Sequence, residues 1–142
     1  MEESVRSQFL IDLEDELFKG AVTLSEWCNF IVCESDTTFI AGADLATIIT
    51  AMAGIETHLR TEYPLDRRAN LCDLIEQAPL NEDLKQEIQT LRKYRNRWVH
   101  VADPEDDQDL LDNSEKYTQE LEDMARQAVR TLRRTIYENQ WV

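Results

Sequence analysis

The sequence has very few of the residues that interrupt helices. Only three glycines and three prolines occur in 142 residues, and the β-branched residues never gather into alternating runs. Three dispersed glycines cannot form the Gly-rich loop that cradles phosphates in many nucleotide-binding proteins. The composition therefore indicates an all-α protein and argues against a β or α/β fold.

Cysteine and histidine are too scarce and too widely spaced for a common metal site. Cys28, Cys33 and Cys72 lack the C-x-x-C spacing and fall in apolar helical settings, which predicts buried, reduced thiols and not disulfides or zinc ligands. Neither His58 nor His100 follows a glutamate by three residues, as a di-iron bundle would require. We therefore expect no metal and no other cofactor.

Long apolar segments are also absent. No stretch approaches the roughly 20 apolar residues of a membrane span, and the acidic N-terminus is not followed by the apolar region of a secretory signal. The formal net charge of −14 indicates a very soluble chain that repels bulk nucleic acid. We expect a cytoplasmic protein without a membrane segment, in which residues 1–142 form a single domain with a sizeable core.

Apolar residues do occur at helical spacing. The first stripe runs from Leu10 to Ile31 and passes Gly20 without losing phase, so one long helix and two shorter helices are equally consistent with it. Polar residues 34–38 are good capping residues and predict a boundary with a second helix. Pro64 ends that second helix, because proline cannot continue a helix there.

The second half of the chain also has the pattern of helices separated by short breaks. A short helix is expected over 66–77, and Asn81 is a good N-cap for the helix that follows. Pro104 breaks the chain within an acidic loop over 102–113, and a last helix is expected from about Ser114. The pattern as a whole predicts a compact bundle of four or five helices.

A cationic patch over residues 91–100 stands out in this acidic chain. It lies on the helix that begins after Asn81, whose apolar line consists of Leu84, Ile88 and Leu91. At Arg95 that line calls for a hydrophobic residue and has a guanidinium instead. Arg92, Lys93 and Arg97 make the patch denser and are candidate substrate-binding residues, and the arginines at 126–134 could join them.

The side chains in this patch suit phosphodiester chemistry. Asn96 and His100 are four residues apart and share a helix face, whereas Arg95 points roughly 140° away from His100. Histidine can move protons near neutral pH, and arginine can bind two phosphate oxygens. An alternative is that His100 compensates the helix dipole while the arginines pair with nearby carboxylates.

The segment Leu91-Arg-Lys-Tyr-Arg-Asn-Arg-Trp-Val-His-Val resembles the signature of the HEPN superfamily, which are small all-α domains. Their motif, an arginine, a polar residue, three further residues and a histidine, lies near the end of a late helix. The order of helices over residues 40–138 is similar too, and it includes an acidic residue, Glu56, on the helix that carries the family's acidic position. The resemblance thus implies a HEPN-like helical bundle.

The resemblance also implies a metal-independent endoribonuclease that works as a homodimer, with two motif helices facing each other across a cleft. His100 would transfer protons, Arg95 would stabilise the charged transition state, Asn96 would position the histidine or the phosphate, and Glu56 would orient Arg95. RNA would be the substrate, in a toxin–antitoxin or phage-defence setting with an antitoxin or another regulatory protein as partner. The alternative is a HEPN-like module that binds a protein, a nucleotide or RNA without cleaving it.

Overall fold

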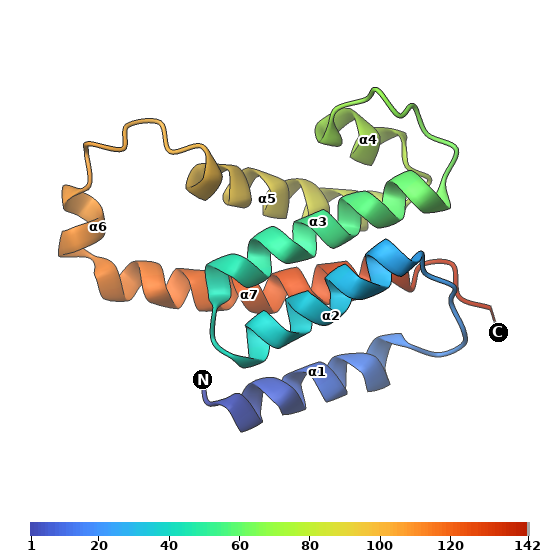
Figure 1. The fold of residues 1–142 in the computed structure, drawn as a ribbon, viewed down its shortest axis with the longest axis horizontal. Helices are drawn as coiled ribbons and strands as arrows, with labels where there is room; N and C mark the ends of the chain where they lie inside the picture. Colours follow the sequence, from blue (N-terminus) through green and yellow to red (C-terminus); the bar gives the residue numbers. More distant parts are fainter. Residues whose placement is uncertain (142) are drawn as a thin grey trace.

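A computed structural model describes residues 1–141, and these residues contain helices but no extended strand. The helices, in chain order, are α1 (Glu3–Leu17), α2 (Glu26–Ile40), α3 (Asp44–Glu62), α4 (Leu71–Gln77), α5 (Glu82–Val99), α6 (Gln108–Asp112) and α7 (Ser114–Ile136). The prediction of an all-α fold is confirmed. Five long helices form the bundle, and α4 and α6 are short helices in the connections between them (Figure 1). Val142, the last residue of the expected domain, lies outside the described residues.

Helix α3 is the centre of the bundle. It packs against α2 and α7 over most of its length and also contacts α4 and α5. Its stripe Ile48, Met52, Ile55 and Leu59 is fully buried, as its spacing predicts. Figure 1 shows α1 as the outermost long helix, next to α2, and α5 on the opposite side of α3. The hydrophobic core draws residues from every helix except α6.

The first apolar stripe forms two helices, which decides between the two alternatives that its sequence left open. Helix α1 ends at Leu17 and α2 begins at Glu26, with Ser25 as its N-cap. The intervening segment is tied to the C-terminal segment, because Ala21 and Trp141 exchange backbone hydrogen bonds of 2.8 and 2.7 Å. A Cβ atom at Gly20 would lie only 2.0 Å from the carbonyl oxygen of Trp141. Glycine is required there by close approach of the backbone.

The boundary expected at residues 34–38 is wrong. These residues lie inside α2, which continues to Ile40. The hydroxyl groups of Thr37 and Thr38 donate to the carbonyl oxygens of Cys33 and Ser35 on their own helix, so they are satisfied without ending it. The turn comes at residues 41–43, where Gly42 has a φ of 80°, a conformation that glycine adopts at little cost.

The later helix boundaries agree more closely with those expected from the sequence. Asn81 caps α5 by accepting from the backbone N–H of Leu84 at 2.8 Å, and α7 begins at Ser114, both as predicted. The short helix expected from residue 66 starts at Leu71 instead, with Asn70 as its N-cap. The loop expected over 102–113 contains the five-residue helix α6.

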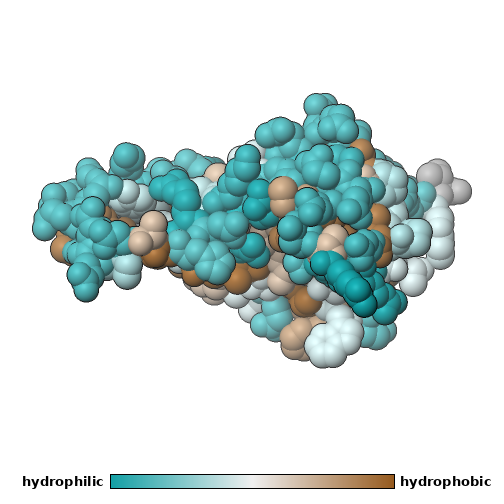
Figure 2. All heavy atoms as spheres, turned by 90° about the horizontal axis from the view of Figure 1, so that it is seen from above, coloured by the Kyte–Doolittle hydropathy of each residue, from teal (hydrophilic) through white to brown (hydrophobic). Residues whose placement is uncertain are grey.

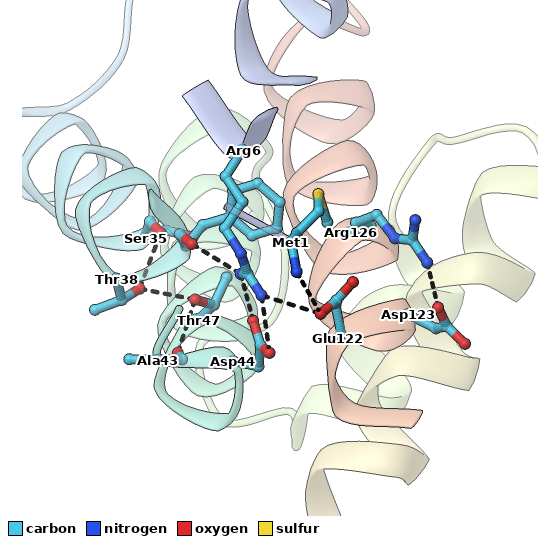
Figure 3. Close-up of polar contacts among 11 residues, drawn as sticks. Met1, Arg6, Ser35, Thr38, Ala43, Asp44, Thr47, Glu122, Asp123 and Arg126 are labelled. Carbon is cyan, nitrogen blue, oxygen red and sulfur yellow. Dashed lines mark hydrogen bonds and ion pairs between the residues drawn. The ribbon is translucent and has the colours of Figure 1, made fainter. Parts of the chain in front are cut away.

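A buried arginine joins α1 to the neighbouring helices. Arg6 is 3% exposed, and its guanidinium donates to the carbonyl oxygen of Phe39 and to both carboxylate oxygens of Asp44. It also lies 3.6 Å from Glu122 and 4.9 Å above the ring of Phe39. Figure 3 shows this cluster at the point where α1, α2, α3 and α7 meet. Buried charge of this kind is stable only when it is paired and hydrogen-bonded.

A second buried arginine secures the other end of α1. Arg133 on α7 is 2% exposed and donates to Glu14 on α1 and to both oxygens of Asp36 on α2. The hydroxyl of Tyr137 donates to the same carboxylate of Glu14. Burial together with that carboxylate holds the pKa of Tyr137 above its ordinary value. The two clusters together attach α1 by charge at both ends.

The cysteines are all free, and the prediction that all three are buried is only partly right. Cys28 is buried, Cys72 is half-buried and Cys33 is exposed. Burial raises the pKa of the Cys28 thiol to about 11. Cys33 is exposed because it lies on the outer face of α2, beside Trp27 and Phe30.

His58 makes the stability of the fold dependent on pH. Its side chain is buried in α3, and burial lowers its pKa below the ordinary value of 6.5, with a partly opposing effect from Glu62. Because the unfolded chain binds the proton more readily, this site is expected to lower the free energy of unfolding as pH falls below 6.5. Urea unfolding of the native protein and of His58→Gln on either side of this pH measures the effect. A native protein that loses no more stability than the variant would contradict it.

The surface is dominated by acidic and polar side chains. Figure 2 shows the upper face of the molecule, where hydrophilic residues cover most of the narrow lobe that carries the end of α5, the following loop and α6. None of the helices within residues 1–141 is both long and apolar enough to cross a lipid bilayer.

Candidate functional site

The cationic patch occupies the C-terminal half of α5, but the apolar line of this helix runs differently from the expected one. After Leu84, Ile88 and Leu91 the buried position is Tyr94, and Trp98 packs against the core one turn later. Arg95 is half-buried and Val99 is exposed. The buried side of α5 therefore faces α7 at this end, where Glu120 lies beside Tyr94. Arg95 is therefore at the margin of the core and does not interrupt it.

Arg95 and Asn96 are brought together by a direct hydrogen bond. The Nε and Nη2 atoms of Arg95 both donate to Oδ1 of Asn96, at 3.2 and 2.8 Å. These bonds hold the guanidinium of Arg95 beside the side-chain amide of Asn96.

His100 lies at the end of the helix with its side chain exposed. It is the C-cap residue of α5, and its backbone N–H donates to the carbonyl oxygen of Asn96 at 2.9 Å. His100 is thus accessible to a ligand and attached to Asn96 through the backbone.

Glu56 is placed differently from its expected role. Its carboxylate pairs with Arg60 on the same helix, at 3.6 Å, and Arg60 also donates to the carbonyl oxygens of Arg67 and Ala69. Among the described residues, no hydrogen bond or ion pair joins Glu56 to Arg95. Among residues 1–141, the side chain that accepts hydrogen bonds from Arg95 is that of Asn96.

Three cations of the patch, Arg92, Lys93 and Arg95, have no carboxylate partner among residues 1–141. Arg92 donates instead to the uncharged side chain of Gln89. The other two cations of α5 are paired, Lys85 with Glu82 at 3.9 Å and Arg97 with Glu120 at 3.5 Å. The three unpaired cations form a positively charged group in a chain that has 29 acidic residues against 15 basic ones.

The arginines of α7 do not join this patch, contrary to expectation. Arg126 pairs with Asp123, Arg130 with Glu16, Arg133 with Glu14 and Asp36, and Arg134 with Glu87. These pairs stabilise contacts of α7 with itself and with α1, α2 and α5. The basic second half of α7 is therefore neutralised within the fold.

A groove that the sequence did not reveal lies directly beside the patch. It is lined by Arg97, Trp98, Val101, Asp103, Pro104, Asp106, Asp107, Asp109, Leu110 and Tyr117. Its two aromatic rings, Trp98 and Tyr117, meet edge to face with centroids 6.1 Å apart. The groove arises because the loop after α5 turns back over the start of α7, which no local pattern in the sequence indicates.

Polar atoms next to this groove are buried without a well-formed hydrogen bond. They are the hydroxyl of Tyr94, the indole N–H of Trp98 and one carboxylate oxygen of Glu120. Burial raises the pKa of Tyr94 to about 12. Native proteins rarely leave such groups without partners, so the polar contact between α5 and α7 is incomplete here.

Within residues 1–141, no three His, Cys, Asp or Glu side chains come together as the ligands of a metal ion would. No family model matches the chain, and no curated protein or solved structure is significantly similar to it.

Proposed function

We propose that the protein is a metal-independent endoribonuclease of HEPN type, acting in a toxin–antitoxin or phage-defence system. The observation that carries this proposal is the group of cations without carboxylate partners around Arg95. The four arginines in the second half of α7 pair with carboxylates within the fold. Arg92, Lys93 and Arg95 instead keep their charge available for an anion, beside an exposed histidine.

The proposed reaction is an attack of the RNA 2′-hydroxyl on the adjacent phosphate. The hydroxyl oxygen forms a bond to phosphorus, the bond to the 5′-oxygen breaks, and the products are a 2′,3′-cyclic phosphate and a 5′-hydroxyl. His100 would take the proton from the 2′-hydroxyl, and a second acid would give one to the leaving 5′-oxygen. His100 of the partner subunit fits that second role, because each chain supplies a single exposed imidazole.

Arg95 and Asn96 would serve the same reaction together. Arg95 would hold the phosphate oxygens as negative charge develops on them. Asn96 fixes the direction of that guanidinium through its amide oxygen. Glu56, which pairs with Arg60 in the single chain, would reach Arg95 only if the assembly rearranged its side chain.

The test is incubation of purified protein with single-stranded RNA in the presence of EDTA. Cleavage should proceed at an undiminished rate, and the fragments should carry 2′,3′-cyclic phosphate and 5′-hydroxyl ends. Fragments with 5′-phosphate ends would exclude attack by the 2′-hydroxyl. Tight binding of RNA without any cleavage would favour the alternative of a non-catalytic binding module, which the strongly acidic composition makes the second candidate.

A further inference from the structure

The groove between the end of α5 and the start of α7 has the properties of a docking site. Its apolar and aromatic lining residues, called its walls below, are Trp98, Val101, Pro104, Leu110 and Tyr117. Its acidic lining residues, called its rim below, are Asp103, Asp106, Asp107 and Asp109. Val101 and Leu110 are 53% and 44% exposed. Apolar side chains in a concave, polar-rimmed surface usually mark an interaction site.

The charge of the rim decides which class of molecule fits. Four aspartates stand against two cations, Arg97, which already pairs with Glu120, and Lys116, whose Nζ lies 6.0 Å from the centre of the Tyr117 ring. The carboxylates of Asp106 and Asp107 have no hydrogen-bond or ion-pair partner among the described residues. RNA is disfavoured here because its phosphates would face these carboxylates, and a second copy presenting the same groove would oppose like charges.

The aromatic residues of the walls favour arginine over lysine as the cation of the partner. A guanidinium can stack on an aromatic face and at the same time form paired hydrogen bonds with a carboxylate, whereas an ammonium cannot form the same planar pair. The rings of Trp98 and Tyr117 stand at right angles, and the four aspartates line the same groove. The carboxylates of Asp106 and Asp107 could therefore bind an arginine whose neighbouring side chains are apolar and lie against the walls.

We propose that this groove binds an arginine-bearing, otherwise apolar segment of a partner protein. Its occupant would contact Arg97 and Val101, which is the residue after His100 in the chain. If the proposed ribonuclease function holds, a partner bound there would restrict access of RNA to His100, as a regulatory protein would. The binding itself does not depend on that function.

The experiment uses a fluorescently labelled, amidated peptide in which arginine alternates with leucine, and the same peptide with citrulline, the uncharged isostere of arginine. Fluorescence anisotropy should show micromolar binding of the arginine peptide and binding at least about tenfold weaker for the citrulline peptide, since one charged hydrogen-bonded pair contributes roughly that factor. Equal binding of the two peptides would overturn the proposal.

Variants distinguish this groove from general attraction to an acidic protein. Asp106→Asn with Asp107→Asn should weaken binding by about tenfold. Asp12→Asn with Asp15→Asn removes the same charge from exposed positions on α1 and should change affinity by less than about twofold at physiological ionic strength, because distant charges are screened. Equal losses in both double variants would overturn the proposal.

The indole N–H signals in an NMR spectrum locate the peptide directly, because the sequence has three tryptophans. The Trp98 signal, assigned with Trp98→Phe, should shift on binding, whereas that of Trp27, which is 77% exposed on α2, should not. A shift of Trp27 alone would place the site on α2 and overturn the proposal. An RNA oligonucleotide that shifts Trp98 and binds the Asp106/Asp107 variant more tightly would assign the groove to RNA.

Self-association is tested by sedimentation. A dimer that dissociates in the Asp106/Asp107 variant would mean that a second copy fills the groove, contrary to the proposal. The outcomes also distinguish failure of the peptide-binding proposal from failure of the proposed ribonuclease activity. Peptide binding without RNA cleavage leaves the groove assignment intact and rejects the ribonuclease, and cleavage without peptide binding does the reverse.

Discussion

Replacing His100 with alanine is expected to lower the rate of RNA cleavage by about 10²–10⁴-fold, the usual contribution of a positioned acid or base. The fold should be unaffected, because the side chain is exposed and only the backbone of this residue bonds to α5. Cleavage rates of the native protein, His100→Ala and His100→Gln, with melting temperatures as a control, measure this. His100→Gln keeps a hydrogen-bonding group but cannot transfer protons near neutral pH, so it should be as slow as the alanine variant.

A mixture of native and variant chains tests whether the site is shared. If the site needs His100 from both subunits, a tenfold excess of His100→Ala chains should leave only about a tenth of the native chains in active dimers, by mass action. Activity would then fall by about tenfold at a constant amount of native protein. Activity that stays constant would show that each chain works alone, and cleavage by the variant itself would reject His100 as the proton-transfer residue.

Replacing Arg133 with alanine is expected to reduce the free energy of unfolding by about 3 kcal/mol. Removal of one partner from a buried ion pair usually costs 3–5 kcal/mol, because the remaining charge is left without compensation. The lower figure applies because Glu14 and Asp36 are partly exposed, with 36% and 27% of their side-chain surface accessible. For a chain of this size the melting temperature should fall by about 10 °C. Urea and thermal unfolding measure both quantities.

Arg130→Ala provides a matched control on the same two helices. Arg130 joins α7 to Glu16 on α1 through two hydrogen bonds, but 36% and 53% of the two side chains is exposed. An exposed pair of this kind contributes about 0–1 kcal/mol. If Arg130→Ala destabilised the protein as much as Arg133→Ala, burial would not be the source of the strength of the Arg133 cluster.

The core of this fold could be predicted from the sequence where the signal is local. The apolar stripe of α3 and the N-cap at Asn81 depend on spacings of three and four residues and on one side chain that binds its own backbone. The break between α1 and α2 could not be predicted in this way. It depends on Trp141, 120 residues after Ala21 in the chain, whose backbone bonds to the segment. Residues 34–38 gave a wrong boundary because the hydroxyl groups of Thr37 and Thr38 bond within the helix.

In the candidate site, too, the local features could be predicted and those that depend on distant residues could not. The positions of Arg95, Asn96 and His100 at the end of one helix follow from the sequence, and the bond between Arg95 and Asn96 is a contact between neighbours. The pairing of Glu56 with Arg60 competes with its expected role, and two residues on one helix turn always have this option. The groove beside the site required knowledge of where the chain goes after Pro104, which depends on packing against α7.

The unpaired cations of α5 have a consequence for how any polyanion would meet this molecule. The chain carries a net charge of −14, so at a distance a polyanion is repelled, and attraction begins only within about one Debye length of the cationic patch, about 10 Å at 0.1 M salt. Dissolved salt then acts in opposite directions on the two stages. It speeds the approach by screening the repulsion, and it weakens the contacts once they are formed. Such a surface associates best at an intermediate ionic strength, unlike a uniformly basic protein, whose binding only weakens as salt is added.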